Sequence, residues 1–240
     1  MKISDYIECM HVLKERFDEE IDRSLSLIAI VKDIPFEKLE LMPIKEVQML
    51  VSEINIELSR KHYEVHSVNG FHLVPNNRIT LGNFIDLETY IHEPDDLTKC
   101  FAILYRKQRL DDWGNTEFEP VKFDITERAN LFLEFETSDV IGRLNTYKDF
   151  RNQIVESYKA IFGLDQEEKQ EEEIDLSQLT KPEIAELEAQ KKKEQEQARF
   201  SWESFVYWLS DNSLVNVEQV LNFPVVYALN MASMRKVFQE

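Results

Sequence analysis

Histidine and glutamate side chains recur at every second position in one short segment of the chain. His62, Glu64 and His66 alternate with apolar residues, and the pair Asn69-Gly70 that follows is a favoured two-residue hairpin turn. Alternate side chains of a strand share one face, so these three residues would lie together, with His72 within reach across the hairpin. Imidazole and carboxylate groups in such an arrangement could bind zinc.

An ordinary hairpin explains the same alternation without a metal. In that interpretation His62, Glu64 and His66 form an exposed polar face, and Tyr63 and Val65 form the buried one. We favour this second interpretation and expect no metal and no cofactor. A metal-dependent enzyme built on the His62 and His66 hairpin remains an alternative.

Other catalytic chemistry has little local support in the sequence. The five glycines are scattered, so they form neither a dinucleotide-binding turn nor a P-loop. No serine occupies a Gly-x-Ser-x-Gly elbow. Cys9 and Cys100 lie in periodic apolar segments, where we expect buried thiols and no disulfide. The sequence therefore predicts a protein that is not an enzyme.

An aromatic stripe near the C-terminus is the strongest candidate for binding another protein. Trp202, Phe205, Trp208 and Leu209 are spaced by three, three and one residues, which places them on one side of a helix. We predict that this face binds a partner, because aromatic side chains dominate many interfaces. The alternative is that the same side chains form the core of the C-terminal helices or pack them onto the rest of the chain.

The elements that would carry these residues are mostly helices. Apolar residues at spacings of three and four predict one long helix at the N-terminus, marked by Ile7, Met10, Leu13, Phe17, Ile21, Leu25 and Ile28. Asp33-Ile34-Pro35 ends it, and a short and a medium helix follow. The further predicted elements are a β-hairpin near 62–74, helices over 81–91 and 95–107, an irregular connection over 109–120, a helix or a strand over 124–135, and a helix of about six turns ending near Gly163.

A change of composition predicts how the chain divides. Residues 165–175 contain seven acids and one lysine, which favours a solvated tether. The fold class is therefore mostly α with one small β-hairpin. We predict a mainly helical domain over 1–163, an acidic linker with an exposed helix over 164–199, and a small C-terminal helical unit over 200–240.

The charge balance restricts the classes of partner. The formal net charge is −18, which repels nucleic-acid phosphates and anionic membranes, so we expect neither as a partner. No apolar run is long enough to span a bilayer, and the first residues pass directly into charged positions. We expect a cytoplasmic protein that binds a protein client, with self-association left open.

Three parts of the chain together resemble a family of tailed-bacteriophage proteins encoded near the tape-measure gene, the tail assembly chaperones. The first part comprises Leu25–Ile30, Ile34–Leu39 and Met42–Val47; the second comprises Ile79–Glu88 and Ala102–Arg106; the third comprises Trp202–Leu209, Asp211, Val217-Glu218 and Val220.

The resemblance implies a non-enzymatic assembly factor that binds and solubilises a tape-measure-type client in the host cytoplasm. The acidic insert and the separate C-terminal unit are longer than a minimal chaperone needs. A structural subunit of the virion, such as a baseplate or scaffold component, is therefore the alternative.

Overall fold

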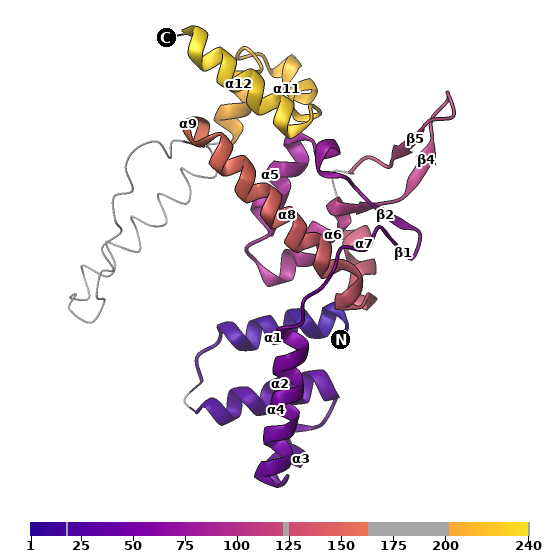
Figure 1. The fold of residues 1–240 in the computed structure, drawn as a ribbon, viewed down its shortest axis with the longest axis vertical. Helices are drawn as coiled ribbons and strands as arrows, with labels where there is room; N and C mark the ends of the chain where they lie inside the picture. Colours follow the sequence, from indigo (N-terminus) through magenta and orange to yellow (C-terminus); the bar gives the residue numbers. More distant parts are fainter. Residues whose placement is uncertain (18, 122–124, 163–201, 240) are drawn as a thin grey trace, which may run out of the picture. The chain divides into compact units, whose positions relative to one another are not determined.

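The computed structural model describes residues 1–17, 19–121, 125–162 and 202–239. These residues are mostly helical with a few small antiparallel strands (Figure 1), which confirms the predicted helical class. Contacts divide the chain into two compact units, Met1–Asn76 with Asp86–Asp149, and Asn77–Ile85 with Phe150–Glu240. Residues 77–85 and 150–162 thus group with the C-terminal residues. The predicted linker over 164–199 lies outside the described residues.

The N-terminal part of the first unit is a bundle of four helices. They are α1 (Ile3–Lys14), α2 (Glu20–Lys32), α3 (Phe36–Glu40) and α4 (Ile44–Leu58). The bundle closes around one apolar cluster, whose buried members are Cys9, Leu25, Leu27, Ile28, Leu39, Val47 and Ile54.

The single long N-terminal helix was a wrong prediction. Helix α1 ends at Lys14, and Glu15 has extended backbone angles. The periodic stripe continues into α2, which packs on α1. Two helices that fold back on each other bury Ile7, Leu25 and Ile28, whereas one straight helix would leave its apolar side in water.

A three-stranded antiparallel sheet follows the bundle. Strand β1 (Ser67–Val68) pairs with β2 (Phe71–Leu73), and β2 pairs with β3 (Tyr105–Arg106). Asn69 and Gly70 both have positive φ, at 48° and 78°, which is the requirement of a type I′ hairpin turn. The predicted hairpin is therefore present, although its strands are shorter than the predicted 62–74.

A second hairpin occupies the segment that was predicted to be irregular. Strand β4 (Gln108–Leu110) pairs with β5 (Thr116–Phe118), with Arg109 opposite Glu117. That prediction was wrong because the turn residues 111–115 connect two paired strands instead of ending regular structure.

The first unit also contains α6 (Leu97–Leu104) and α7 (Thr126–Leu131), with the 3-10 turns η2 (Pro94–Asp96) and η3 (Phe132–Glu134). The 3-10 turn η1 (Asn76–Arg78) and the helices α5 (Leu81–Tyr90) and α8 (Thr137–Ser157) have residues in both units. Aromatic rings fill the space between the sheet and these helices. Phe132 lies at the centre, with ring centroids 4.7 Å from Phe135, 5.2 Å from Phe71 and 6.0 Å from Phe101.

The second unit joins residues from three parts of the sequence. Its C-terminal helices are residues 202–209, α11 (Leu214–Leu221) and α12 (Val225–Gln239), and α9 (Lys159–Phe162) packs on α12. The amide of Leu81 donates to the carbonyl of Phe223 at 2.8 Å, and the amide of Val225 donates to the carbonyl of Ile79 at 2.9 Å. These two bonds tie the start of α5 to the α11–α12 turn.

Helix α8 approaches the segment before β1 so closely that a side chain would not fit between them. A Cβ atom built on Gly142 would lie 2.0 Å from the carbonyl oxygen of Tyr63 and 2.7 Å from the amide nitrogen of Glu64. Both neighbours are backbone atoms, so neither can rotate away. Glycine at this position therefore permits the contact.

We predict that Gly142→Ala destabilises the protein by about 1–3 kcal/mol, because the new methyl group must push the two backbones apart. In an unconstrained helix the same change would stabilise by roughly 1 kcal/mol, so the sign is informative. Urea unfolding followed by circular dichroism measures the effect. Asn145→Ala, at an exposed position of the same helix, is the control and should change the midpoint little. An unchanged or higher midpoint for Gly142→Ala would show that the close contact is not required.

Candidate functional site

The histidine segment does not form the predicted strand. Residues 61–66 are irregular, and β1 begins only at Ser67. Tyr63 was expected to be buried, but 75% of its surface is exposed. The alternation of polar and apolar residues is therefore not a strand pattern here. Within the described residues, no group of three or more His, Cys, Asp or Glu side chains could hold a metal ion.

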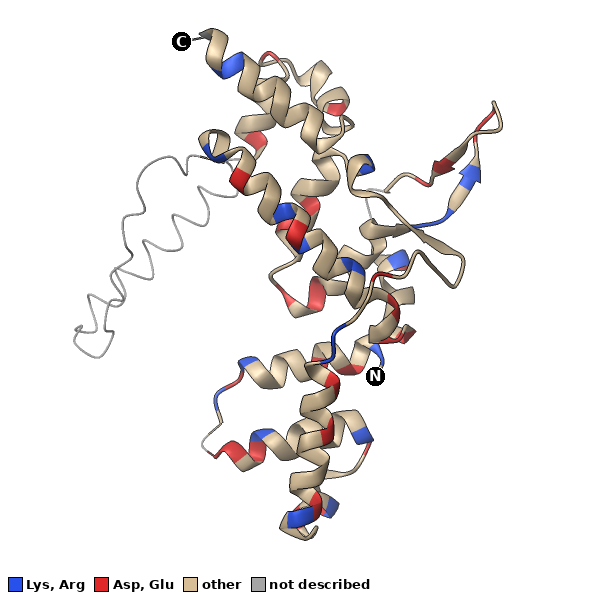
Figure 2. Ribbon diagram, viewed as in Figure 1, with Lys and Arg blue, Asp and Glu red and all other residues tan. Residues whose placement is uncertain are grey.

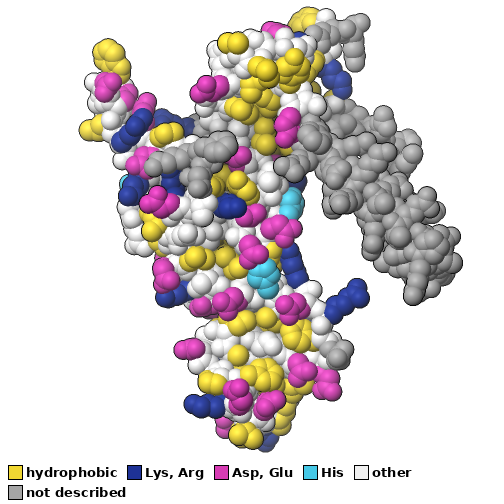
Figure 3. All heavy atoms as spheres, turned by 180° about the vertical axis from the view of Figure 1, so that it is seen from behind, with side chains coloured by type: hydrophobic (Ala, Val, Ile, Leu, Met, Phe, Trp, Pro, Cys, Tyr) yellow, Lys and Arg dark blue, Asp and Glu magenta, His cyan; other side chains and the backbone are white. Residues whose placement is uncertain are grey.

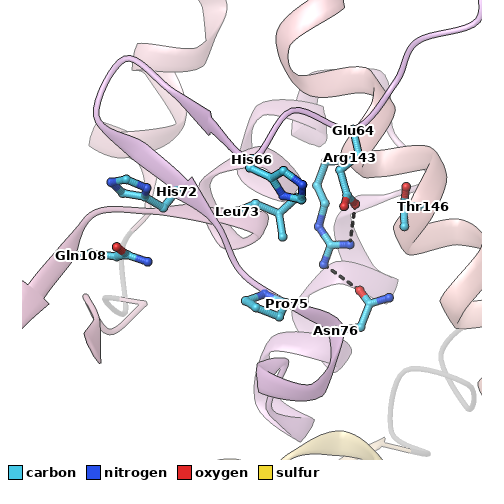
Figure 4. A pocket seen from close by; sticks show the side chains of 9 residues that line it. All are labelled: Glu64, His66, His72, Leu73, Pro75, Asn76, Gln108, Arg143 and Thr146. Carbon is cyan, nitrogen blue, oxygen red and sulfur yellow. Dashed lines mark hydrogen bonds and ion pairs between the residues drawn. The ribbon is translucent and has the colours of Figure 1, made fainter. Parts of the chain in front are cut away.

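Glu64 instead contacts a buried arginine of α8. The side chain of Arg143 is 1% exposed and lies 3.2 Å from the Glu64 carboxylate. Its guanidinium also donates to the carbonyl of Val74 and to Oδ1 of Asn76, both at 2.7 Å. Figure 4 shows the side chains of Glu64 and Asn76 meeting the guanidinium of Arg143. Burial lowers the pKa of the Arg143 guanidinium, and Glu64 opposes that shift by stabilising its charge.

A cavity of about 480 Å³ lies over this contact, lined by Glu64, His66, His72, Leu73, Pro75, Asn76, Gln108, Arg143 and Thr146. Three of the four predicted histidine-hairpin residues, Glu64, His66 and His72, line it, while His62 does not. The positive charge of Arg143 is already paired with Glu64, and two further donors are used by the chain itself. The cavity therefore offers little charge to a ligand, and Arg143 serves to hold residues 64–76 on α8.

Tyr105 adds a second anchor for the same segment. Its hydroxyl lies 2.8 Å from the carbonyl oxygen of Val65 and 3.2 Å from that of Asp139, so it can donate to either. The side chain is buried, and this burial raises the pKa of Tyr105. A neutral hydroxyl donor is thus kept at all ordinary pH values. The residues around the cavity together attach residues 64–76 to α8, and we call this attachment the joint.

The predicted partner-binding residues lie together in the second unit, and all four are half-buried. The ring of Trp202 lies 5.8 Å from Phe84, 5.8 Å from Phe162 and 5.9 Å from Phe205. These contacts give the cluster a role in the core of this unit, which is the alternative considered above. Binding of a partner by this cluster stays a prediction.

Trp208, the third residue of the stripe, lies beside a charged neighbour. The guanidinium of Arg235 lies 4.9 Å from the ring of Trp208, donates to the Trp208 carbonyl at 2.6 Å, and pairs with Asp211 at 2.7 Å. Arg235 therefore covers one face of the indole and fixes the end of the helix. Leu209, next in sequence, is half-buried.

Sequence reasoning missed a different apolar face, on α12. Its buried side consists of Val225, Ala228, Leu229 and Ala232. Its opposite side carries four large exposed apolar side chains at spacings of four, three and four, namely Tyr227, Met231, Met234 and Phe238. We call these four residues the α12 face. The sequence of α12 has apolar residues all around the helix. This pattern predicts a buried helix but does not show which side faces the core.

The α12 face lies in a part of the chain with little acidic charge. Over residues 214–239 the sequence has one acid, Glu218, against Arg235 and Lys236. Figure 2 shows α12 almost free of acidic residues, although they are frequent on the helices of the first unit. Figure 3 shows hydrophobic side chains gathered over the C-terminal helices.

Comparisons with protein families, with curated proteins and with solved structures find no match to this chain. Among the described residues, no helix has both the length and the apolar character that a membrane span requires.

We predict that replacing Arg143 by Met lowers the free energy of unfolding by about 3 kcal/mol, because Glu64, Val74 and Asn76 lose their shared donor in a largely buried place. Chemical denaturation measures the change. Lys148→Met, on the exposed side of the same helix, is the matched control. Equal losses for the two variants would contradict the role of Arg143 as a joint.

The two cysteines are free and buried, as the sequence predicted. Burial raises the pKa of Cys9 to about 11 and the pKa of Cys100 to about 12. We predict that an aromatic disulfide reagent modifies the folded chain at pH 8 roughly 100-fold or more slowly than free cysteine, because the thiolate is the reacting form. Urea should restore full reactivity. The single variants Cys9→Ala and Cys100→Ala assign a rate to each thiol. A thiol that reacts in the folded protein as fast as free cysteine would contradict the prediction.

Proposed function

We propose that this chain is a non-enzymatic protein-binding factor that holds an apolar stripe of a helical client, in the manner of a phage tail assembly chaperone acting in the host cytoplasm. The observation that carries the proposal is the α12 face. Large exposed apolar side chains that form a contiguous stripe on a soluble protein mark interaction surfaces more often than chance exposure does.

The geometry of the α12 face suits a helix as the bound element. Tyr227, Met231, Met234 and Phe238 repeat with the period at which two packed helices interdigitate. The ring of Phe223 lies 5.2 Å from Tyr227 and extends the aromatic end of this stripe. A client helix with its own apolar stripe could therefore lie along α12.

The residue types favour a tolerant binding surface. Met231 and Met234 occupy the middle of the face, and unbranched thioether side chains adapt to differently shaped partners. A holder of a long client must accept many successive apolar stripes of varied sequence. The acidic chain would keep the complex soluble, because the net charge of the whole chain is −18.

We predict that Met234→Lys weakens binding of a helical client peptide roughly 10-fold or more, because the ammonium group must be desolvated at the centre of the contact. The probe is a synthetic amphipathic helix with Leu at heptad positions, titrated by isothermal calorimetry, alongside a scrambled peptide of the same composition. Met49→Lys is the matched control, since Met49 is 65% exposed on α4 and Met234 is 55% exposed on α12. Equal affinity of the two variants, or of the two peptides, would refute the proposed binding face.

The chaperone function makes a separate prediction about assembly. Coexpression with a tape-measure-type client should raise the soluble yield of that client, and Met234→Lys should remove the gain while Met49→Lys keeps it. The protein should be absent from purified virions, because a holder leaves when the tail tube polymerises. Stoichiometric recovery in virions would instead establish a structural subunit.

A further inference from the structure

The β4–β5 hairpin is an arm with a firmly held tip. The amide of Asp111 donates to the carbonyl of Asn115 at 2.8 Å, and the amide of Gly114 donates back to the Asp111 carbonyl at 3.0 Å. The Asp111 carboxylate accepts from the amides of Trp113 and Asn115 at 2.9 and 2.7 Å, and from the Asn115 side chain at 3.0 Å. Gly114 has φ +78°, which closes the turn. These bonds, the one from the Asn115 side chain first, favour the ionised carboxylate and hold the pKa of Asp111 below its usual range.

This tip presents a tryptophan to solvent. Trp113 is 89% exposed and Leu110, at the end of β4, is 71% exposed. The other two tryptophans of the chain, Trp202 and Trp208, are half-buried and packed against rings or a guanidinium. Hydrophobic side chains are visible at the end of the arm in Figure 3. An indole held in water by a network of local hydrogen bonds contributes no burial to this fold, but it is preorganised to enter a pocket elsewhere.

A second copy of the chain is a poor occupant for this arm. A two-fold antiparallel pair centred on the middle residue of β4 would place Arg109 opposite Arg109, and one centred on the middle residue of β5 would place Glu117 opposite Glu117. Like charges directly opposite each other destabilise a sheet. The net charge of −18 on each copy adds a general repulsion.

The charges around Trp113 indicate what kind of surface would accept it. Asp111 and Asp112 precede the indole in the turn, and over residues 107–119 the arm carries four acids against two basic residues, Lys107 and Arg109. An apolar pocket with lysine or arginine at its rim would match both the ring and the carboxylates. We propose that the β4–β5 arm docks Trp113 into a basic-rimmed apolar pocket of a different protein.

This docking site is independent of the α12 face. Trp113 belongs to the first unit of the chain and α12 to the second. Trp113→Ala should therefore leave binding of the helical client peptide unchanged, and Met234→Lys should leave docking of the arm unchanged. Loss of binding at one surface while binding at the other is retained therefore shows which of the two proposals fails.

The test begins with a photoreactive benzoylphenylalanine in place of Trp113, in the full-length chain in the cell that naturally makes it. Tyr63 replaced in the same way is the control, because Tyr63 is 75% exposed in the same unit and lies outside the arm. We expect a crosslink specific to position 113, mapped by mass spectrometry to residues that line an apolar pocket with basic neighbours. A crosslink to this chain itself, to lipid, or at equal yield from both positions would overturn the proposal, as would no crosslink.

The partner identified in this way is then purified and titrated. Trp113→Ala should weaken binding roughly 30-fold, as expected of a buried tryptophan anchor, with no change in the melting temperature. Asp111→Ala keeps the indole but removes three hydrogen bonds of the turn, so it should weaken binding by a smaller factor. Binding should also fall with added salt. Wild-type affinity for Trp113→Ala would refute the anchor.

Discussion

Two adjacent residues of α8, Gly142 and Arg143, fix the segment that leads into the small sheet. The absence of a side chain at Gly142 lets the backbone of residues 63–64 lie against the helix. The buried side chain of Arg143 then reaches Glu64, Val74 and Asn76. The contact depends on both residues, because the missing side chain of Gly142 leaves room for the neighbouring backbone and the guanidinium of Arg143 supplies the hydrogen-bond donors. Strand β2 lies between two of these attachments, so its position follows from them.

The same joint links the small sheet to the aromatic core of the first unit. Phe71, in β2, lies 5.2 Å from the ring of Phe132, and Phe132 in turn contacts Phe135 at 4.7 Å. The amide of Ile3 donates to the carbonyl of Phe135 at 2.9 Å, which attaches the start of α1 to this core. Contacts between residues far apart in sequence, rather than helix propensity, therefore place the elements of this unit.

The parts of the fold that depend on local chemistry could be predicted from the sequence. Asn69-Gly70 demands positive φ angles and forms the expected turn, and Cys9 and Cys100 are buried as their apolar neighbours indicated. The parts that depend on distant contacts could not. No spacing in the sequence reveals that Gly142 faces residue 63, and the stripe from Ile7 to Ile28 has the same period whether it forms one helix or two.

The candidate surfaces follow the same division. The stripe from Trp202 to Leu209 was visible as a pattern, but a pattern of three and four does not say which side of a helix meets the core. The structure gives those residues internal contacts and leaves the outer side of α12 exposed. Helix α12 is apolar on two opposite sides, and its own unit covers only one of them. The exposed Trp113 differs again, since its turn is closed by hydrogen bonds that do not involve the indole. In both places large apolar side chains are exposed on an ordered element, and this shared property is the basis of the two binding proposals.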